Sequence, residues 1–164
     1  MKNKNILLLT QAAMIAALYV VLTFLANAFG LASGAIQVRL SEMLTILPAF
    51  TPAAIPGLAI GCFLSNLLTG CCILDIVMGS IATLLGAIGA YLLRKWKWLI
   101  PIPAILANAM IVPWVLTSPY GYGLTDAWSY LVVTVSVGEI ISCEILGMIL
   151  YFALQKYAGK LFYR

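Results

Sequence analysis

The stretch at residues 36–42, IQVRLSE, carries three polar side chains between two long apolar runs. Gln37 offers an amide that donates and accepts hydrogen bonds, Arg39 a permanent cation and Glu42 a carboxylate. Arg39 and Glu42 are three positions apart, so on a helix they can pair with each other and need no ligand. The alternative, which we favour, is that the three side chains help to form a binding site for a polar molecule.

Glu139 and Asn108 lie in the middle of long apolar segments. An ionisable group inside a membrane span costs about 2.5–3.5 kcal/mol on insertion scales, so it usually faces a bundle interior or a wet cavity. Both residues fall near mid-depth, and we expect both to contact a ligand. Glu139 can instead serve only to fasten the bundle through a hydrogen bond to another helix. Glu144 falls on a different face of the same helix, where a structural role is an equal alternative.

Other polar groups lie near the predicted outer ends of their helices. Asn66 and Asp75 are candidates for the site, together with Asn27 at the same rim. Asp75 can also interact with the positive end of its own helix, and Asp126 is interpreted as a solvated helix cap. Four aromatic residues border one outer loop, either as an interfacial belt or as a stacking lid over a flat heterocycle: Trp114, Tyr120, Tyr122 and Trp128.

The composition predicts that these side chains belong to an integral membrane protein. Of 164 residues, 64% are hydrophobic and only 9% are charged, which is too apolar for an ordinary soluble domain. A helix needs roughly 20 residues to cross the hydrocarbon core, so the chain has room for about six helices with short loops. We therefore expect an all-α, single-domain bundle of six transmembrane helices over residues 1–164.

The apolar segments define the expected helices. The first segment has a basic start and an ANA tripeptide that resembles a signal-peptidase site, but its apolar run is longer than a signal core and favours a retained helix. The second segment looks too short and too polar at its start for a simple lipid-facing span. The predicted helices cover residues 6–29, 38–50, 52–68, 75–93, 99–116 and 128–155.

The basic residues predict the orientation, because Lys and Arg are retained on the cytoplasmic side. In a six-helix topology they all fall on one side except Arg39, so both termini are expected in the cytoplasm. The net charge of +4 then reflects topology and gives no indication of nucleic-acid binding. Arg39 and the five acidic residues leave the outer loops and interior electronegative, which suits a cationic or donor-rich ligand. The basic set is Lys2, Lys4, Arg94, Lys95, Lys97, Lys156, Lys160 and Arg164.

Two further residue groups are assigned to packing. The sequence holds four cysteines but no histidine, so we expect packing cysteines, no metal site and no cofactor. Small residues spaced four apart allow helices to approach closely, as in the GxxxG pair Gly57 and Gly61. The same spacing occurs on one face of the first helix, at Ala12, Ala13, Ala16 and Ala17.

Several segments together resemble the QueT family of proposed substrate-binding (S) components of energy-coupling factor transporters. They are GAIQVRLSEMLTILPAF, GLAIGCFLSNLL, DIVMGSIATLLGA, NAMIVPW and VGEIISCEILG, and the likeness extends over most of the chain. The resemblance implies a pocket open to the exterior of the cell membrane and a ligand of the 7-deazaguanine type, such as queuine or its aminomethyl precursor. The substrate-binding residues carried over from it are Gln37, Arg39, Glu42, Asn66, Asp75, Asn108 and Glu139.

The resemblance also implies partners. The small-residue face of the first helix would meet a transmembrane coupling protein, which is driven by two cytoplasmic ATPases. The sequence has no GxxxxGK[ST] loop of its own. The alternatives are an S component for another vitamin-like solute, a self-sufficient transporter in which Glu139 or Glu144 relays a proton, and a small membrane enzyme, which the lack of histidine disfavours.

Overall fold

The computed structural model describes residues 2–31 and 37–158, and within them it shows helices and turns without any strand. This confirms the all-α prediction. The elements in chain order are α1 (Lys2–Ala28), η1 (Leu40–Ala49), α2 (Ala54–Leu68), α3 (Ile73–Leu92), η2 (Lys97–Leu99), α4 (Ile102–Thr117), α5 (Trp128–Glu139), η3 (Ile140–Leu146) and α6 (Gly147–Gln155).

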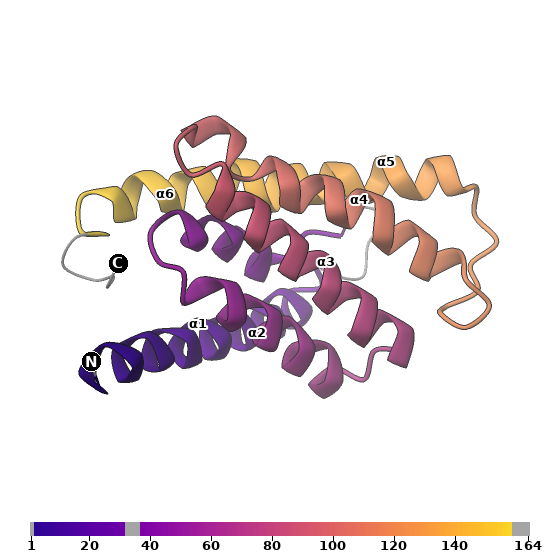
Figure 1. The fold of residues 1–164 in the computed structure, drawn as a ribbon. Helices are drawn as coiled ribbons and strands as arrows, with labels where there is room; N and C mark the ends of the chain where they lie inside the picture. Colours follow the sequence, from indigo (N-terminus) through magenta and orange to yellow (C-terminus); the bar gives the residue numbers. More distant parts are fainter. Residues whose placement is uncertain (1, 32–36, 159–164) are drawn as a thin grey trace.

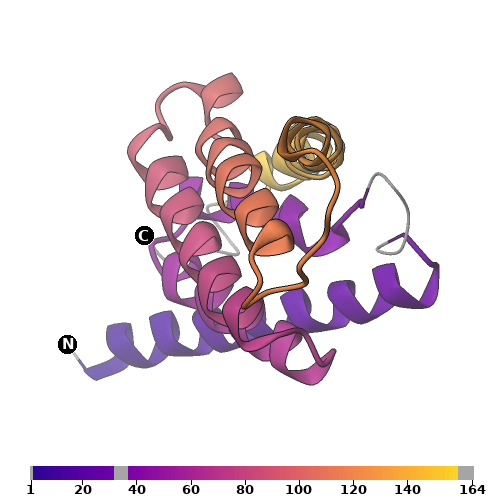
Figure 2. The same ribbon diagram turned by 90° about the vertical axis from the view of Figure 1, so that its right-hand side faces the viewer.

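The chain runs back and forth along one bundle (Figure 1). The start of α1, the end of α6, the η1–α2 turn and the α3–α4 connection lie at the same end, which we call the terminal end. The α2–α3 turn and the α4–α5 loop lie at the opposite end, which we call the loop end. In Figure 2, viewed from the loop end, α5 is seen end on whereas α1 crosses the view, so the two helices are inclined to each other.

Four segments are long and apolar enough to cross a membrane, namely Lys4–Ala28, Ile73–Leu92, Lys97–Thr117 and Trp128–Gln155. The other two predicted helices are present as η1, with 10 residues, and α2, with 15 residues. Both are shorter than the roughly 20 residues that a full span needs. The chain is therefore a multi-pass membrane protein with six helical segments in the described residues, of which four have full spanning length.

η1 lies at the centre of the bundle. It packs against α1, α3, α6 and η3, and seven of its ten residues are buried. Its geometry is 3₁₀, whereas the sequence predicted an ordinary helix from about residue 38. Runs of 3₁₀ longer than four residues are uncommon. Residues three apart eclipse each other in this geometry, which stacks Glu42 above Thr45, and the Thr45 hydroxyl donates to the Glu42 carbonyl at 2.6 Å.

The predicted last helix has the predicted bounds, residues 128–155, but it is not a regular α-helix throughout. Its middle section, η3, is a π-helix between α5 and α6. π-helical turns inside α-helices are rare and are frequently found at functional sites. The sequence placed Glu139 and Glu144 on different helix faces by assuming 3.6 residues per turn. A π-helical segment has a different number of residues per turn, so the predicted angle between the two side chains does not apply.

The α1–α2 pair confirms the close approach that the small residues predicted. A Cβ atom at Gly57 would lie 2.7 Å from the carbonyl oxygen of Ala12, and one at Gly61 would lie 2.7 Å from the Cβ of Tyr19. Ala16 is also in contact, with its Cα 3.1 Å from the same hypothetical atom. Glycine is therefore required at both positions of α2, and the close crossing brings Tyr19 toward the middle of the bundle.

Candidate functional site

A cavity of about 390 Å³ lies near the loop end of the bundle. Its walls come from α1, the segment before η1, η1, α2, the α2–α3 turn, α3, α4 and the α4–α5 loop. Most of the lining side chains are polar, which is unusual for the interior of a membrane protein. The lining residues are Thr23, Ala26, Asn27, Gln37, Arg39, Ser41, Asn66, Thr69, Cys71, Asp75, Val112, Leu116, Tyr122 and Leu124.

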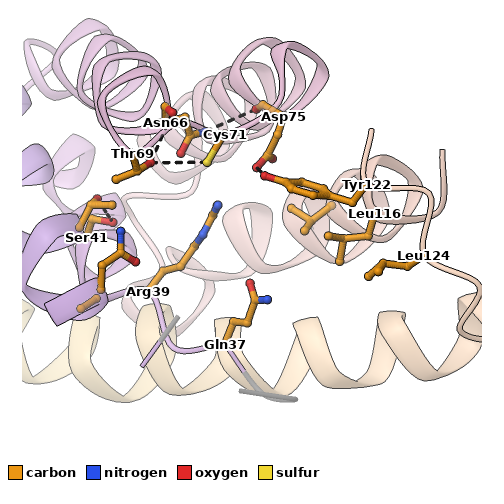
Figure 3. A pocket seen from close by; sticks show the side chains of 14 residues that line it. Gln37, Arg39, Ser41, Asn66, Thr69, Cys71, Asp75, Leu116, Tyr122 and Leu124 are labelled. Carbon is orange, nitrogen blue, oxygen red and sulfur yellow. Dashed lines mark hydrogen bonds between the residues drawn. The ribbon is translucent and has the colours of Figure 1, made fainter. Parts of the chain in front are cut away.

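Arg39 is extended and not helical, with φ −95° and ψ 98°, and it directly precedes η1. Its backbone N–H donates to the hydroxyl of Ser142 at 3.1 Å, which attaches this segment to η3. The guanidinium extends across the cavity toward Cys71 and Asp75 (Figure 3). The guanidinium makes no hydrogen bond and no ion pair with any described residue. The helical Arg39–Glu42 pair considered from the sequence therefore does not form.

Asp75 lies in the first turn of α3 and is buried, with 6% of its surface exposed. The helix cap is Cys72, whose sulfur accepts the Asp75 backbone N–H at 3.4 Å. This leaves the Asp75 carboxylate free to face the cavity near the positive end of the helix dipole. Its Oδ2 accepts a hydrogen bond from the Tyr122 hydroxyl at 3.2 Å, as Figure 3 shows.

Tyr122 is the aromatic residue of the outer loop that reaches the cavity. Burial, and after it the charge of Asp75, raises the pKa of the Tyr122 phenol above its ordinary value, so the phenol stays protonated and donates to the carboxylate. Trp114, Tyr120 and Trp128 are exposed, in agreement with an interfacial belt. Of the four aromatic residues, Tyr122 is the one placed where the stacking lid considered from the sequence could form, and the lid stays a prediction.

Asn66 supplies an amide to the cavity wall. Its Nδ2 donates to the carbonyl oxygen of Asp75 at 3.4 Å, and a Cβ atom at Gly79 would lie only 3.0 Å from that nitrogen. A side chain at Gly79 would therefore require the amide to shift by a few tenths of an ångström. Gln37 and Asn27 are exposed at the mouth of the cavity, where they remain accessible to solvent.

Glu42, Asn108 and Glu139 do not line this cavity. They form, with Cys143, a second and fully buried group that we call the acid cluster, in which the exposed fractions of Glu42, Asn108 and Glu139 are 0%, 1% and 4%. One ligand atom from each of Glu42, Glu139 and Cys143 lies within 4.8 Å of the other two. The sequence predicted a common depth for Asn108 and Glu139, and the structure brings both next to Glu42.

Hydrogen bonds satisfy the acid cluster only in part. The Tyr19 hydroxyl donates to Oε1 of Glu42, and the Cys143 thiol donates to Oε2 of Glu139 at 3.3 Å. Oε2 of Glu42 and both polar atoms of the Asn108 amide are buried without a hydrogen-bond partner in the described residues. Buried polar groups of this kind are rare and call for an explanation, such as a bound ion, water or substrate.

The π-helix explains how the acid cluster is assembled. η3 begins directly after Glu139, and both Ser142 and Cys143 within it are buried toward η1. The Ser142 hydroxyl donates to the carbonyl of Gly138 at 2.9 Å and accepts the Arg39 N–H. One short segment therefore fixes the Arg39 backbone for the cavity and presents Glu139 to the acid cluster.

Several site residues were not found from the sequence. Tyr19 lies 23 positions before Glu42, and no local pattern connects the two. Cys143 was interpreted as a packing residue, although its position four residues after Glu139 is the spacing of helix neighbours.

Asp126 is exposed, and Ala127 is the cap residue of α5, so the predicted Asp126 cap is wrong.

The alanine face of α1 is divided between two environments. Ala12 and Ala16 are buried against α2, whereas Ala13 and Ala17 are exposed. All four line a shallow apolar groove between α1 and α2, together with Leu9, Val20, Ile60 and Leu64. Of these four alanines, Ala13 and Ala17 are the two that a partner protein could contact.

The sequence is similar to those of known proteins. The sequence model of a family described as "QueT transporter" matches residues 9–156. The chain is similar to the "Queuosine precursor transporter QueT" of Lactococcus lactis subsp. cremoris (strain MG1363), with 34% identity over 98 residues. That alignment covers 59% of this chain and 57% of the relative, so the chain spans less than two thirds of the relative's length. No solved structure matches the chain.

Proposed function

The chain belongs to the QueT transporter family, and on that premise we propose that it is the substrate-binding subunit of an ATP-driven importer of the energy-coupling factor type. The substrate is a queuosine precursor of the 7-deazaguanine class, such as queuine or its aminomethyl precursor. The name of the Lactococcus relative supports the queuosine-related ligand. The chain itself acts as a binding and release component and not as an enzyme.

The observation that carries this proposal is the opposition of Arg39 and Asp75 across one cavity. A guanine-like edge presents two adjacent N–H donors, which a carboxylate accepts in bidentate fashion, and a carbonyl, which a guanidinium serves as donor. Asp75 and Arg39 supply these two partners. A cavity of about 390 Å³ lies within the roughly 300–1,000 Å³ range of small-molecule sites.

The remaining proposed site residues have supporting roles. Gln37 and Asn66 offer amides to the polar atoms at the periphery of the ring, and the ring of Tyr122 provides a surface for stacking. We place Glu42, Asn108 and Glu139 beneath the substrate, where their electronegative character favours a donor-rich or cationic guest. Arg39 interacts electrostatically with the carboxyl groups of Glu42 and Glu139. It therefore connects the cavity with the acid cluster.

Transport in this proposal needs partner proteins in the cell membrane. The chain has no GxxxxGK[ST] phosphate loop, so two cytoplasmic ATPases and a transmembrane coupling protein supply the energy. The groove on α1 and α2 that contains Ala12, Ala13, Ala16 and Ala17 is the proposed surface for the coupling protein. The loop end, with the cavity, faces the exterior, and the terminal end with its basic residues faces the cytoplasm.

Isothermal titration of purified protein with queuine and its aminomethyl precursor tests the proposal. We expect saturable binding that Asp75→Asn weakens at least about tenfold, because a charge-assisted hydrogen bond contributes about 1.5–3 kcal/mol. The matched control is Asp126→Asn, an exposed aspartate of the outer loop, which should bind as the unmodified protein does.

Two results would contradict the proposal in different ways. Equal affinity in Asp75→Asn would remove this carboxylate from the site. Uptake that persists in cells lacking the ATPase partners would instead favour a self-sufficient transporter, in which a buried carboxyl such as that of Glu139 couples transport to an ion gradient.

A further inference from the structure

The buried side-chain atoms without a hydrogen-bond partner in the described residues all belong to the acid cluster. Glu42 Oε2 and Asn108 Oδ1 and Nδ2 are buried and make no hydrogen bond of standard geometry to any described residue, although the Asn108 amide lies next to both carboxyl groups. Leaving one such atom unsatisfied costs about 1–3 kcal/mol, and more for a charged group. A ligand that accepts electron pairs from the two oxygens would remove most of this penalty.

The acid cluster brings two carboxyl groups close to a single arginine. Glu42 and Glu139 contribute two carboxylates, and the groups that donate to them, the Tyr19 phenol and the Cys143 thiol, are neutral donors. Arg39 is the cation that interacts with both carboxylates, and it also interacts with Asp75 in the cavity above. With both carboxylates ionised, Arg39 compensates at most one of them, and one positive charge is missing.

The available donor atoms favour a hard cation. Two carboxylates and an amide carbonyl are oxygen ligands, and they come from three separate elements, η1, α4 and the end of α5. A hard cation that binds oxygen at about 2.3–2.6 Å places opposite ligands about 5 Å apart. Carboxylate oxygens of Glu42 and Glu139 lie within 4.8 Å of each other, which fits that spacing. The Cys143 thiol donates a hydrogen bond to Glu139, so it acts as a hydrogen-bond donor and not as a soft thiolate ligand.

We propose that Glu42, Asn108 and Glu139 bind one monovalent cation of the sodium class beneath the substrate cavity. The ion supplies the missing positive charge and satisfies Glu42 Oε2 and Asn108 Oδ1. It also ties η1, α4 and α5 together directly below Arg39. The site is separate from the cavity lining and does not depend on the identity of the organic substrate.

Thermal unfolding of the purified full-length chain in detergent, without any organic ligand, tests the cation site. Samples in sodium chloride and in choline chloride at equal ionic strength are compared. We expect about 100 mM sodium to raise the unfolding midpoint by about 5 °C or more, because a ligand bound only to the folded state stabilises it by mass action. Equal midpoints in the two salts would overturn the proposal, and this comparison needs no variant.

Variants then locate the ion. Glu139→Gln should lose the sodium response, whereas Glu144→Gln, a half-buried glutamate in η3, should keep it. Asn108→Leu provides a second test if Glu139→Gln does not fold. The leucine side chain is similar in size to that of asparagine but has no carbonyl oxygen to bind the ion. A sodium response that survives in Glu139→Gln or Asn108→Leu would overturn the assignment. A midpoint that depends on pH and not on sodium would also overturn it, because a proton would then occupy the carboxyl pair.

Discussion

Arg39 and Glu42 are neighbours in the sequence but serve different sites. The Arg39 side chain enters the cavity, and the Glu42 carboxylate is buried below it against Tyr19. The separation follows from a change of backbone conformation, since Arg39 is extended and Glu42 belongs to the 3₁₀ segment. A spacing of three residues predicts a contact only when both residues lie in the same helix.

At the residue scale, Tyr19 should be important for stability. Tyr19→Phe removes the hydroxyl that donates to Glu42 and leaves a buried carboxylate oxygen without its partner. We expect the free energy of unfolding to fall by about 1–3 kcal/mol. Equilibrium denaturation in mixed detergent measures the change. Tyr130→Phe, at an exposed tyrosine of α5, is the matched control and should be close to neutral, and an equal effect of the two substitutions would contradict the assigned role.

At the scale of elements, helix geometry departs from the α-helical pattern in two places. η1 is 3₁₀ and η3 is π-helical, and these segments carry Glu42 and Cys143, with Glu139 directly before η3. The 3₁₀ row places Thr45 below Glu42, and the π turn directs Ser142 to Arg39 and Cys143 to Thr45. Both departures occur where η1 and η3 pack against each other, so tertiary contacts override the local preference for an α-helix.

The α1 helix offers a test of the proposed docking groove. Ala17 is exposed in the groove, so Ala17→Leu should leave the fold and ligand binding unchanged but reduce transport at least about tenfold by blocking close helix approach. Ligand titration and cellular uptake measure the two properties separately. Ala28→Leu, also exposed on α1 but outside the groove, is the matched control.

Ala16→Leu should behave differently from Ala17→Leu. Ala16 is buried against Gly61, and a larger side chain there would separate α1 from α2 and lower the stability of the protein itself. Normal uptake by Ala17→Leu would contradict the docking surface. A loss of binding in Ala17→Leu would show that the groove supports the cavity rather than a partner.

At the scale of the whole molecule, the two ends of the bundle differ in charge. The described residues at the terminal end include Arg94, Lys95 and Lys97, and the loop end carries the cavity and Asp126. Because Lys and Arg are retained on the cytoplasmic side, the terminal end should face the cytoplasm.

Labelling of introduced cysteines measures this orientation. The background variant carries Cys71→Ser and Cys72→Ser, so that the remaining native thiols, those of Cys62 and Cys143, are buried. In this background a membrane-impermeant maleimide should label Asp126→Cys in intact cells. Lys97→Cys should react only after the cells are permeabilised. The reverse pattern would place the cavity on the cytoplasmic side and contradict uptake from outside.

The sequence by itself determined the features that depend on composition and local pattern. Apolar segment length set the helical class and most helix bounds, because burying a helix in lipid requires a continuous apolar run. Small-residue spacing set the α1–α2 crossing at Gly57 and Gly61, and isolated polar residues such as Glu139 and Asn108 indicated the interior that they share. The matched family confirms the resemblance seen in the motifs.

Only the tertiary structure decided how the polar residues divide into two sites. Arg39 and Asp75 line the cavity, whereas Glu42, Asn108 and Glu139 lie in the acid cluster. That division depends on an extended residue before a 3₁₀ segment and on a π-helical turn, which are fixed by contacts between elements far apart in the chain. Periodicity assumes one regular helix geometry, so it reports which residues are polar and buried but not which of them meet.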